Sequence, residues 1–193
     1  MSCWTILTVI IRKLVWGDFA LIKLFKKGNN NIQVGVEVRT DGIAFAKAVR
    51  NGSQSEWGLA FHEFVPCTAA ERKGELSKLV DKSGSGGALC NVVLPSNQYQ
   101  IFQIEKPAVD DSELSEAVVW KLKELIDYPL EDSVSDVFDF PDDATRGRGA
   151  QVNVVSARKA LLQELVGLIN DSGLTLSTID VTELALRNLA TMF

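Results

Sequence analysis

Residues 94–181 constrain the fold of this chain most, because their pattern switches between strand and helix in a fixed order. Residues 99–104 alternate between apolar and polar side chains, as a half-buried strand does. Asp110 and Glu113 form a capping-box-like pair, which predicts the start of a helix. Residues 133–140 return to a period of two, which predicts a second strand.

Three further elements follow the turn-rich residues 141–149. Residues 151–155 predict a strand, Ser156 is the expected N-cap of a helix that ends at Gly173, and residues 176–181 predict a last strand. Each of the two helices has one apolar stripe, which is Leu114, Val118, Leu122 and Leu125 in the first and Leu161, Leu165 and Leu168 in the second. The sequence thus predicts β-α-β-β-α-β, with both helices on one face of a four-stranded antiparallel sheet.

The preceding part of the chain predicts a meander. Residues 32–38, 42–49 and 59–65 read as three strands joined by short turns. Thr68 with Glu71 then opens a helix, and a glycine-rich turn leads into another strand at residues 89–94. A helix after a meander suggests a mixed sheet with helical cover, so the expected fold class is α/β (α+β).

Several short motifs in the second half of the chain resemble one family. In chain order they are Leu94-Pro95, Glu105-Lys106-Pro107, Tyr128-Pro129-Leu130-Glu131-Asp132, Asp136-Val137-Phe138-Asp139-Phe140, Asn153-Val154-Val155-Ser156-Ala157, Asp171-Ser172-Gly173-Leu174, and Ile179-Asp180-Val181 followed by Leu184-Ala185-Leu186. Together they resemble the cytoplasmic PilM-type proteins of type IV pilus assembly. The resemblance is nearest to the MshI-type members that serve the mannose-sensitive haemagglutinin (MSHA) pilus.

The resemblance implies an actin-like (ribonuclease H-like) lobe that carries an inserted βαββαβ subdomain. On that basis the chain divides into an apolar and basic segment (1–31), the first part of the lobe (32–95), the inserted subdomain (96–181) and the start of a connection to a second lobe (182–193). We therefore expect either the first half of a longer protein or a short gene product. In both cases these residues alone could not close a nucleotide cleft between two lobes.

The first hairpin is the candidate cofactor site. The resemblance places here a phosphate-gripping loop of the form Gly-Val-Asp-Ile-Gly-Ser-Ser-Ser-Val-Lys, in which small residues let backbone N–H groups approach the phosphates. This chain keeps an acid as Glu37, but Arg39 replaces the close-approach glycine and Ala44 replaces the lysine, with Thr40 and Gly42 between them.

Asp41 adds a negative charge where the phosphate would lie, although Arg39 could in principle pair with a phosphate. We therefore expect no bound cofactor, and ATP with Mg²⁺ only where a second lobe is present. The alternative function, an actin-like ATPase of pilus or type II secretion assembly, would need this loop to be intact.

No catalytic or metal site is expected from the sequence. His62 is the only histidine and lies in a predicted strand, where packing or exposure explains it more simply than nucleophilic chemistry. The cysteines, Cys3, Cys67 and Cys90, have no CxxC spacing, and their odd number excludes a complete set of internal disulfides. A reduced, cytosolic compartment fits this usage best.

Charge is distributed unevenly along the chain. Residues 105–143 hold 13 acids and 3 lysines, a net charge of −10, so the rest of the chain sums to +5. An acidic surface disfavours nucleic acid, since phosphate contacts need lysine and arginine. Two interpretations remain, a solvated acidic face and a docking surface for a basic partner.

The N-terminal segment, residues 3–27, is both apolar and basic. The segment contains four large aromatic residues, Trp4, Trp16, Phe19 and Phe25, mixed with five lysines and arginines. This charge is too high for a membrane span. The segment also lacks the small-residue cleavage site of a secretory signal. It could lie on the anionic inner leaflet as peripheral membrane contact, or pack on the protein or on a partner. We favour packing.

The resemblance implies a non-catalytic cytoplasmic scaffold, peripheral to the inner membrane, in the pilus assembly platform. Its expected partner is the cytoplasmic tail of a PilN-like membrane protein, bound in a groove between the lobe and the inserted subdomain, where an extended peptide could dock. Trp120, Tyr128 and Leu130 are the candidate groove residues, although we favour a core position for Trp120 and Leu130. A related alternative is the cytoplasmic half of a type II secretion platform protein.

Overall fold

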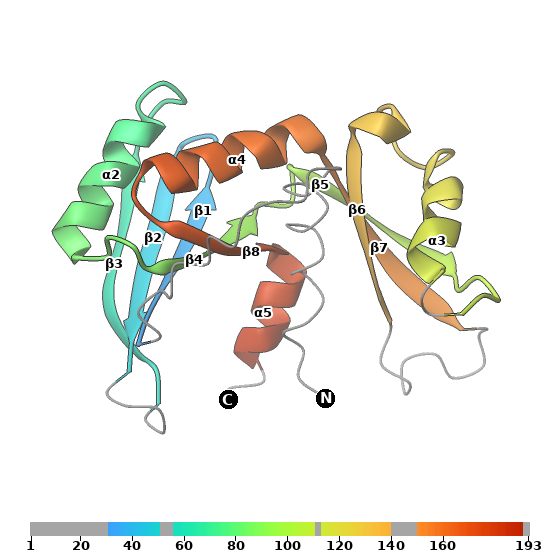
Figure 1. The fold of residues 1–193 in the computed structure, drawn as a ribbon, viewed down its shortest axis with the longest axis horizontal. Coiled ribbons are helices and arrows are strands. Elements are labelled where there is room, and N and C mark those ends of the chain that lie inside the picture. The colour runs from blue at the N-terminus through green and yellow to red at the C-terminus, as the bar shows by residue number, and fades with distance from the viewer. Residues whose placement is uncertain (1–30, 51–55, 111–112, 140–149, 191–193) are drawn as a thin grey trace, which may run out of the picture. The chain divides into compact units, whose positions relative to one another are not determined.

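The computed structural model describes residues 31–50, 56–110, 113–139 and 150–190 (Figure 1). They form two compact units, which are considered separately below. The inserted unit comprises the described part of residues 96–162, and the larger unit comprises the described residues up to 95 and from 163 onwards.

The larger unit is built on a five-stranded mixed sheet. Its elements are β1 (Ile32–Val38), β2 (Gly42–Val49), β3 (Gly58–Pro66), α2 (Arg72–Ser83), β4 (Leu89–Leu94), α4 (Lys159–Asp171), β8 (Thr175–Val181) and α5 (Thr182–Ala190). The first turn of α4, up to Leu162, belongs to the inserted unit, and the rest of the helix belongs to the larger one. The strand order is β3-β2-β1-β4-β8, in which the first three strands are antiparallel and β1, β4 and β8 are parallel. This confirms the predicted meander, helix and strand.

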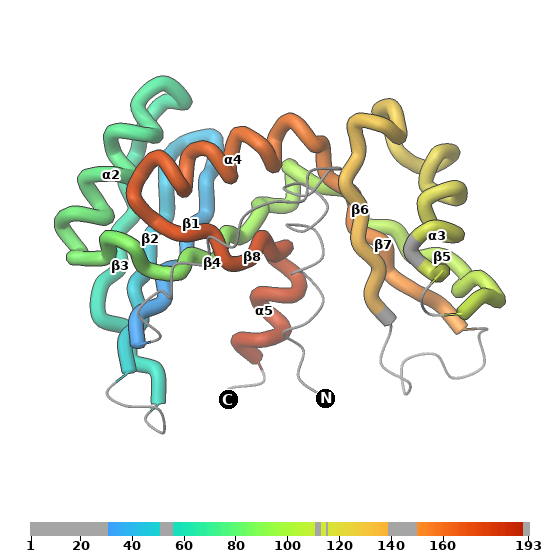
Figure 2. Tube along the Cα trace, in the orientation of Figure 1, coloured from blue at the N-terminus to red at the C-terminus, as the bar shows by residue number. Residues whose placement is uncertain are grey.

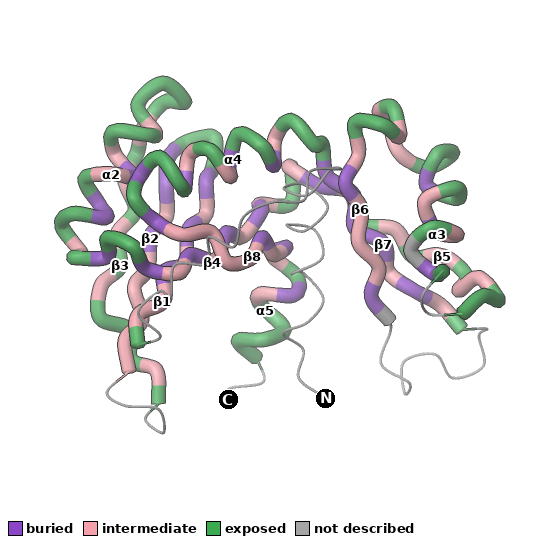
Figure 3. The backbone as a smooth tube through the Cα atoms, viewed as in Figure 1, coloured by how far each residue is buried: buried purple, intermediate pink, exposed green. Residues whose placement is uncertain are grey.

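Alternation along the strands separates the two faces of this sheet. Val34, Val36 and Val38 are buried on one face of β1, and their neighbours Ile43 and Phe45 are buried on β2 (Figure 3). α2 and α4 cover this face with buried side chains, which are Leu76, Leu79 and Val80 from α2 and Leu165 and Ile169 from α4. The buried face is the core of the unit.

Local signals mark the two ends of α2. Thr68 N donates a 2.9 Å hydrogen bond to the Glu71 carboxylate just before α2, as a capping pair does. Gly84 ends the helix in the left-handed conformation (φ 61°), where a side chain would be strained. Lys73 of α2 and Asp171 of α4 form an ion pair at 2.7 Å, so these two helices lie side by side.

The inserted unit is a three-stranded antiparallel sheet with one helix on it. Its elements are β5 (Tyr99–Glu105), α3 (Leu114–Leu122), a 3₁₀ turn (Leu130–Asp132), β6 (Ser133–Asp139) and β7 (Gln151–Arg158), with the strand order β5-β7-β6. Its core is formed by side chains from α3 and β7, which are Leu114, Val118, Leu122, Val152 and Val154. The predicted stripe of α3 is thus confirmed for its first three members.

Two details of the sequence prediction are wrong. Residues 175–181 do not complete a four-stranded sheet in the inserted subdomain; they pair in parallel with β4 of the larger sheet. The physical reason is the crossover, because α4 separates β7 from β8 and lets the chain return parallel to β4 (Figure 2). Ser156 is not an N-cap: β7 continues to Arg158 because it pairs on both sides with β5 and β6.

Among the residues that the structure describes, no helix has both the length and the apolar character needed to cross a bilayer.

Candidate functional site

The turn between β1 and β2 holds the residues of the predicted phosphate loop. Arg39 N donates to the Gly42 carbonyl at 2.9 Å and closes the turn. The Arg39 guanidinium binds both oxygens of the Asp41 carboxylate, with Nε–Oδ1 at 3.0 Å and the second contact at 3.3 Å. It also lies 5.5 Å from the centre of the Phe64 ring. A phosphate would therefore have to compete with a carboxylate already held in the turn.

The rest of this turn serves packing. A Cβ atom added to Gly42 would lie 2.3 Å from the Val65 carbonyl oxygen, so the glycine allows β2 and β3 to approach closely. The Arg39 carbonyl accepts a hydrogen bond from Arg72 of α2 at 2.8 Å, while Thr40 is exposed. The close contact between β2 and β3 thus explains Gly42, which the sequence analysis had assigned to the candidate phosphate loop.

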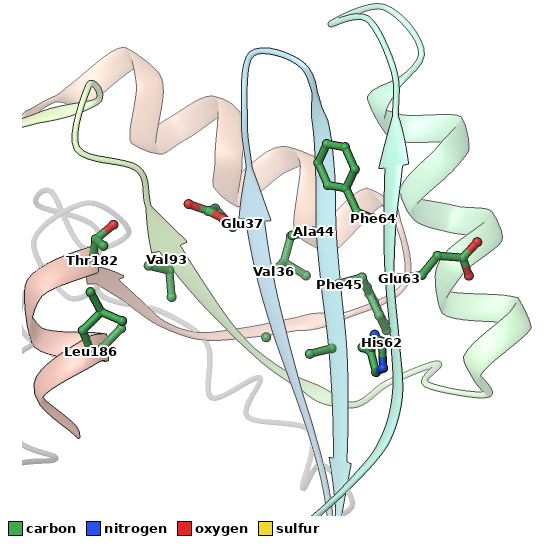
Figure 4. A pocket seen from close by; sticks show the side chains of 13 residues that line it. Val36, Glu37, Ala44, Phe45, His62, Glu63, Phe64, Val93, Thr182 and Leu186 are labelled. Carbon is green, nitrogen blue, oxygen red and sulfur yellow. The ribbon is translucent and has the colours of Figure 1, made fainter. Parts of the chain in front are cut away.

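A hollow of about 510 Å³ lies on the opposite face of the same sheet (Figure 4). We call this side, which faces away from α2 and α4, the open face. α5 lies against β4 and β8 on this side and forms one wall of the hollow through Leu186, while Phe64 of β3 stands at the other side. Leu186 is 58% exposed and Phe64 is 44% exposed, so both apolar rims are open to solvent.

The strand register explains the floor of the hollow. Phe64, Ala44, Glu37 and Val93 form one row across β3, β2, β1 and β4. The next row brings His62, Ala46, Gly35 and Asn91 together. Ala44 in the first row, and Ala46 with Gly35 in the second, leave room above the sheet. A Cβ at Gly35 would meet nothing within 4 Å. The sequence analysis did not find this hollow, although the small residues at alternate positions of β1 and β2 were its signal.

The charges of the hollow do not favour a phosphate. The Glu37 side chain is half-buried in the floor, and its carboxylate makes no hydrogen bond or ion pair with any described residue. No lysine or arginine belongs to its described lining, in which His62 is the other titratable group besides Glu37 and Glu63. Glu63 is held by Lys82 of α2 at 2.6 Å. The described lining, apolar with acidic groups and no lysine or arginine, therefore does not suit an anion.

A further carboxylate continues the row of Glu37. Asp180 of β8 pairs in register with Val93. Burial raises the pKa of Asp180. Two interactions partly oppose that rise: the Val181 N–H donates a hydrogen bond to Asp180 Oδ1 at 2.8 Å, and the positive charge of Arg187 favours the ionised carboxylate. Ionisation of Asp180 is therefore less favourable in the folded chain than in the unfolded one.

We expect Asp180→Asn to raise the melting temperature at pH 7. The folded pKa is higher than the unfolded one, so ionisation destabilises the fold at neutral pH, and this cost disappears as the pH falls below the ordinary value of 3.8. Thermal unfolding at pH 7 and near pH 3 tests this, with Asp81→Asn on exposed α2 as the matched control. A lower melting temperature of Asp180→Asn at pH 7 would contradict the expectation.

The three predicted groove residues do not form one surface. Trp120 is 72% exposed on the side of α3 that faces away from the core, so the core interpretation is wrong for it. Leu130 packs against the core of the inserted unit. The Tyr128 hydroxyl donates to Ser156 Oγ at 2.9 Å, and the Arg158 guanidinium lies 4.3 Å from the centre of its ring. Burial raises the pKa of Tyr128.

Other titratable groups show no reactive arrangement in the described part of the chain. His62 is exposed at the rim of the hollow, and Cys90 is fully buried, which raises the pKa of its thiol. Within the described ranges, no group of three histidine, cysteine or acidic side chains is placed to hold a metal ion. Cys3 and residues 3–27, for which membrane contact or packing was predicted, lie outside the described residues.

No family model matches the chain, and no curated protein matches it. Several solved structures are similar to the chain, and two of them come from pilus and secretion assemblies. PilM of the PilM–PilN type IV pilus biogenesis complex has a TM-score of 0.69 at 20% identity, over 83% of this chain and 50% of that chain. The cytoplasmic domain of EpsL, an inner-membrane component of the type II secretion system of Vibrio cholerae, has a TM-score of 0.59 at 14% identity, over 78% of this chain and 56% of that chain.

This chain thus spans about half the length of the solved structures that it matches. At these identities the likeness concerns the fold. In fold, the chain is similar to the actin-like proteins PilM and EpsL, which come from pilus and secretion assemblies.

Proposed function

We propose that this chain is a non-catalytic, cytoplasmic scaffold of an inner-membrane type IV pilus assembly platform, where it binds the cytoplasmic tail of a PilN-like membrane protein. The observation that carries the proposal is the fold likeness to PilM, which was solved as part of a complex with PilN. The sequence motifs, which resemble MshI-type proteins most closely, favour the MSHA pilus within this class.

The chemistry of the first hairpin supports a role without nucleotide. Phosphate binding needs free backbone N–H groups or cationic side chains. Here the Arg39 guanidinium is paired with Asp41, and the neighbouring open face presents the unpaired carboxylate of Glu37. These features argue against the ATPase alternative.

A second candidate is the corresponding scaffold of a type II secretion platform. The likeness to the EpsL cytoplasmic domain supports it, although the TM-score with PilM is higher. Both candidates are scaffolds, so the partner that binds decides between them.

Isothermal titration of the chain tests the proposal. We expect heat on adding a synthetic peptide of the cytoplasmic tail of the PilN-like partner, and none on adding ATP with Mg²⁺. Arg39→Ala serves as the control for the nucleotide arm, because ATP heat that disappears in this variant would locate binding in the first hairpin. ATP binding would overturn the nucleotide-free role, and a chain that binds the tail of a secretion partner instead would favour the second candidate.

A further inference from the structure

β3 is an edge strand whose outer side has no partner strand in the described part of the chain. It ends the order β3-β2-β1-β4-β8, so β2 is its neighbour on one side only. The strand is nine residues long. The free N–H and C=O groups of such an edge are a template for pairing with another strand.

The hydrogen-bond alternation along β2 and β3 identifies the backbone groups that face outwards. Cys67 N donates to the Asp41 carbonyl at 3.3 Å, just beyond the end of β3. Hydrogen-bonded pairs recur at every second residue of an antiparallel ladder, so Glu63, four residues earlier, also bonds to β2. The residues on either side of it, His62 and Phe64, therefore direct their N–H and C=O groups away from β2.

The devices that usually protect an edge strand are missing from the middle of β3. Natural edges carry lysine, an internal proline or a bulge. β3 contains no lysine or arginine, and Pro66 is its last residue. The register shift lies between Lys47 and Ala48, opposite the beginning of β3, so residues 61–65 pair regularly with β2. This regular stretch is open to a further strand, and Phe64 within it is 44% exposed.

We infer that residues 61–65 pair antiparallel with the same residues of a second copy of this chain, about a two-fold axis at Glu63. The inference does not depend on the partner proposed above. This register places the outward groups of His62 opposite those of Phe64 in the second copy, which gives four backbone hydrogen bonds across the interface. The two five-stranded sheets become one continuous sheet.

The side chains that this register brings together are complementary. On the side of α2, Phe61 lies opposite Val65 of the second copy, and an aromatic residue with a β-branched one is a favourable cross-strand pair. On the open face, His62 lies opposite Phe64 of the second copy, so that two aromatic rings meet where the single chain exposes one.

Charge favours a second copy over an unrelated strand. Glu63 is the only acid of β3; it points toward α2 and pairs with Lys82 of that helix at 2.6 Å (Figure 4). Lys82 Nζ also lies 5.7 Å from the centre of the Phe61 ring. In the proposed register Phe61 is the diagonal neighbour of Glu63 in the second copy, within reach of a long side chain. The two lysines therefore balance the two glutamates that meet at the axis.

Sedimentation equilibrium of the full chain at increasing protein concentration tests the inference, and we expect a reversible monomer–dimer equilibrium. His62→Pro should raise the dimer dissociation constant by about thirtyfold, because each dimer loses two backbone hydrogen bonds. The outward N–H of His62 takes no part in the pairing with β2, so the sheet itself tolerates this proline. His62→Val is the matched control, because it keeps the N–H and should leave the dimer intact.

Two further variants test the register without a proline. Glu63→Cys should form a disulfide between two copies in oxidised glutathione, because the axis places this position opposite itself. Mass spectrometry identifies the linked peptides, with the unmodified chain as the control for its own cysteines. Lys82→Ala should raise the dissociation constant by about fivefold, whereas Lys78→Ala, whose lysine pairs with Glu75 of the same helix, should not change it.

Several results would overturn the inference. A chain that stays monomeric is one, and a dimer that His62→Pro leaves unchanged, which would place the interface elsewhere, is another. Equal weakening by His62→Val and His62→Pro would show that the imidazole, and not strand pairing, holds the copies together. If thermal unfolding shows that His62→Pro has lost the fold, an absent Glu63→Cys disulfide decides against the register. A monomer in which His62→Pro abolishes binding of the PilN-like tail peptide would assign this edge to that peptide.

Discussion

Leu122→Ala is expected to lower the free energy of unfolding of the inserted unit by about 2–5 kcal/mol, since it leaves a cavity in a closed core. Leu122 has no exposed surface and packs with Val118 of the same helix and with Val152 and Val154 of β7. The unit has one helix on three strands, so there is little other apolar burial to compensate.

Hydrogen exchange during urea unfolding measures this effect in each unit separately. Amides of β7 report on the inserted unit, and amides of β1 report on the larger unit. Trp120→Ala is the matched control on the same helix: Trp120 is 72% exposed, so its removal should change stability by no more than about 0.5 kcal/mol. If Leu122→Ala and Trp120→Ala lowered the free energy of unfolding equally, Leu122 would not lie on the core-facing side of α3.

Gly42→Ala should destabilise the larger unit by about 1–3 kcal/mol, the usual cost of overpacking. Its Cβ would lie 2.3 Å from the Val65 carbonyl oxygen and 2.8 Å from Phe64, and the backbone oxygen cannot move without disturbing the pairing of β2 with β3. Urea unfolding measures the change, and the effect should be the same with and without ATP.

Gly35→Ala is the control for this glycine. It is on the neighbouring strand and has nothing within 4 Å of its added Cβ, so it should be neutral or stabilise by up to about 1 kcal/mol, because glycine is costly within a strand. If Gly42→Ala were as harmless as Gly35→Ala, the close approach of β2 and β3 would not be the reason for the glycine.

Local patterns were sufficient to predict most elements of this fold. The alternation in residues 32–49, the pair Thr68 and Glu71, and the glycine that follows α4 each act over a few residues. The structure has the strands and the helix end that they indicate, whereas α2 begins at Arg72, a turn after Thr68. The hydrogen bond between Thr68 and Glu71 is nevertheless present. The pairing of β8 was wrong because period-two alternation does not identify the neighbouring strand. The neighbour of β8 is determined by α4, because the length and packing of this helix return the chain to the side of β4.

The helix faces were predicted less accurately than the helices. In α4 the buried side chains are Leu162, Leu165 and Ile169, so the prediction is confirmed for Leu165, while Leu161 and Leu168 are half-buried. The face that a helix buries is set by the sheet against which it packs, which the apolar pattern of an individual helix does not specify. Leu125, the last member of the predicted stripe of α3, follows the end of the helix and is 43% exposed.

The candidate site was the hardest part to predict. The sequence identified the hairpin of Glu37 and Arg39, but the pairing of Arg39 with Asp41 depends on the geometry of the turn. The hollow itself depends on which alanines of β2 lie beside Gly35, and register is a tertiary property.

The parallel pairing of β4 with β8 has a consequence for biosynthesis. β4 is complete when Leu94 has been made, but its neighbour on one side begins only at Thr175, after the whole inserted unit. While the chain is being synthesised, the edge of β4 (Leu89–Leu94) that later pairs with β8 therefore has no partner strand and is available for aggregation or for chaperone binding. Such a distant pairing raises the contact order, so closure of the larger sheet, and not the meander, should limit the folding rate of the nascent chain.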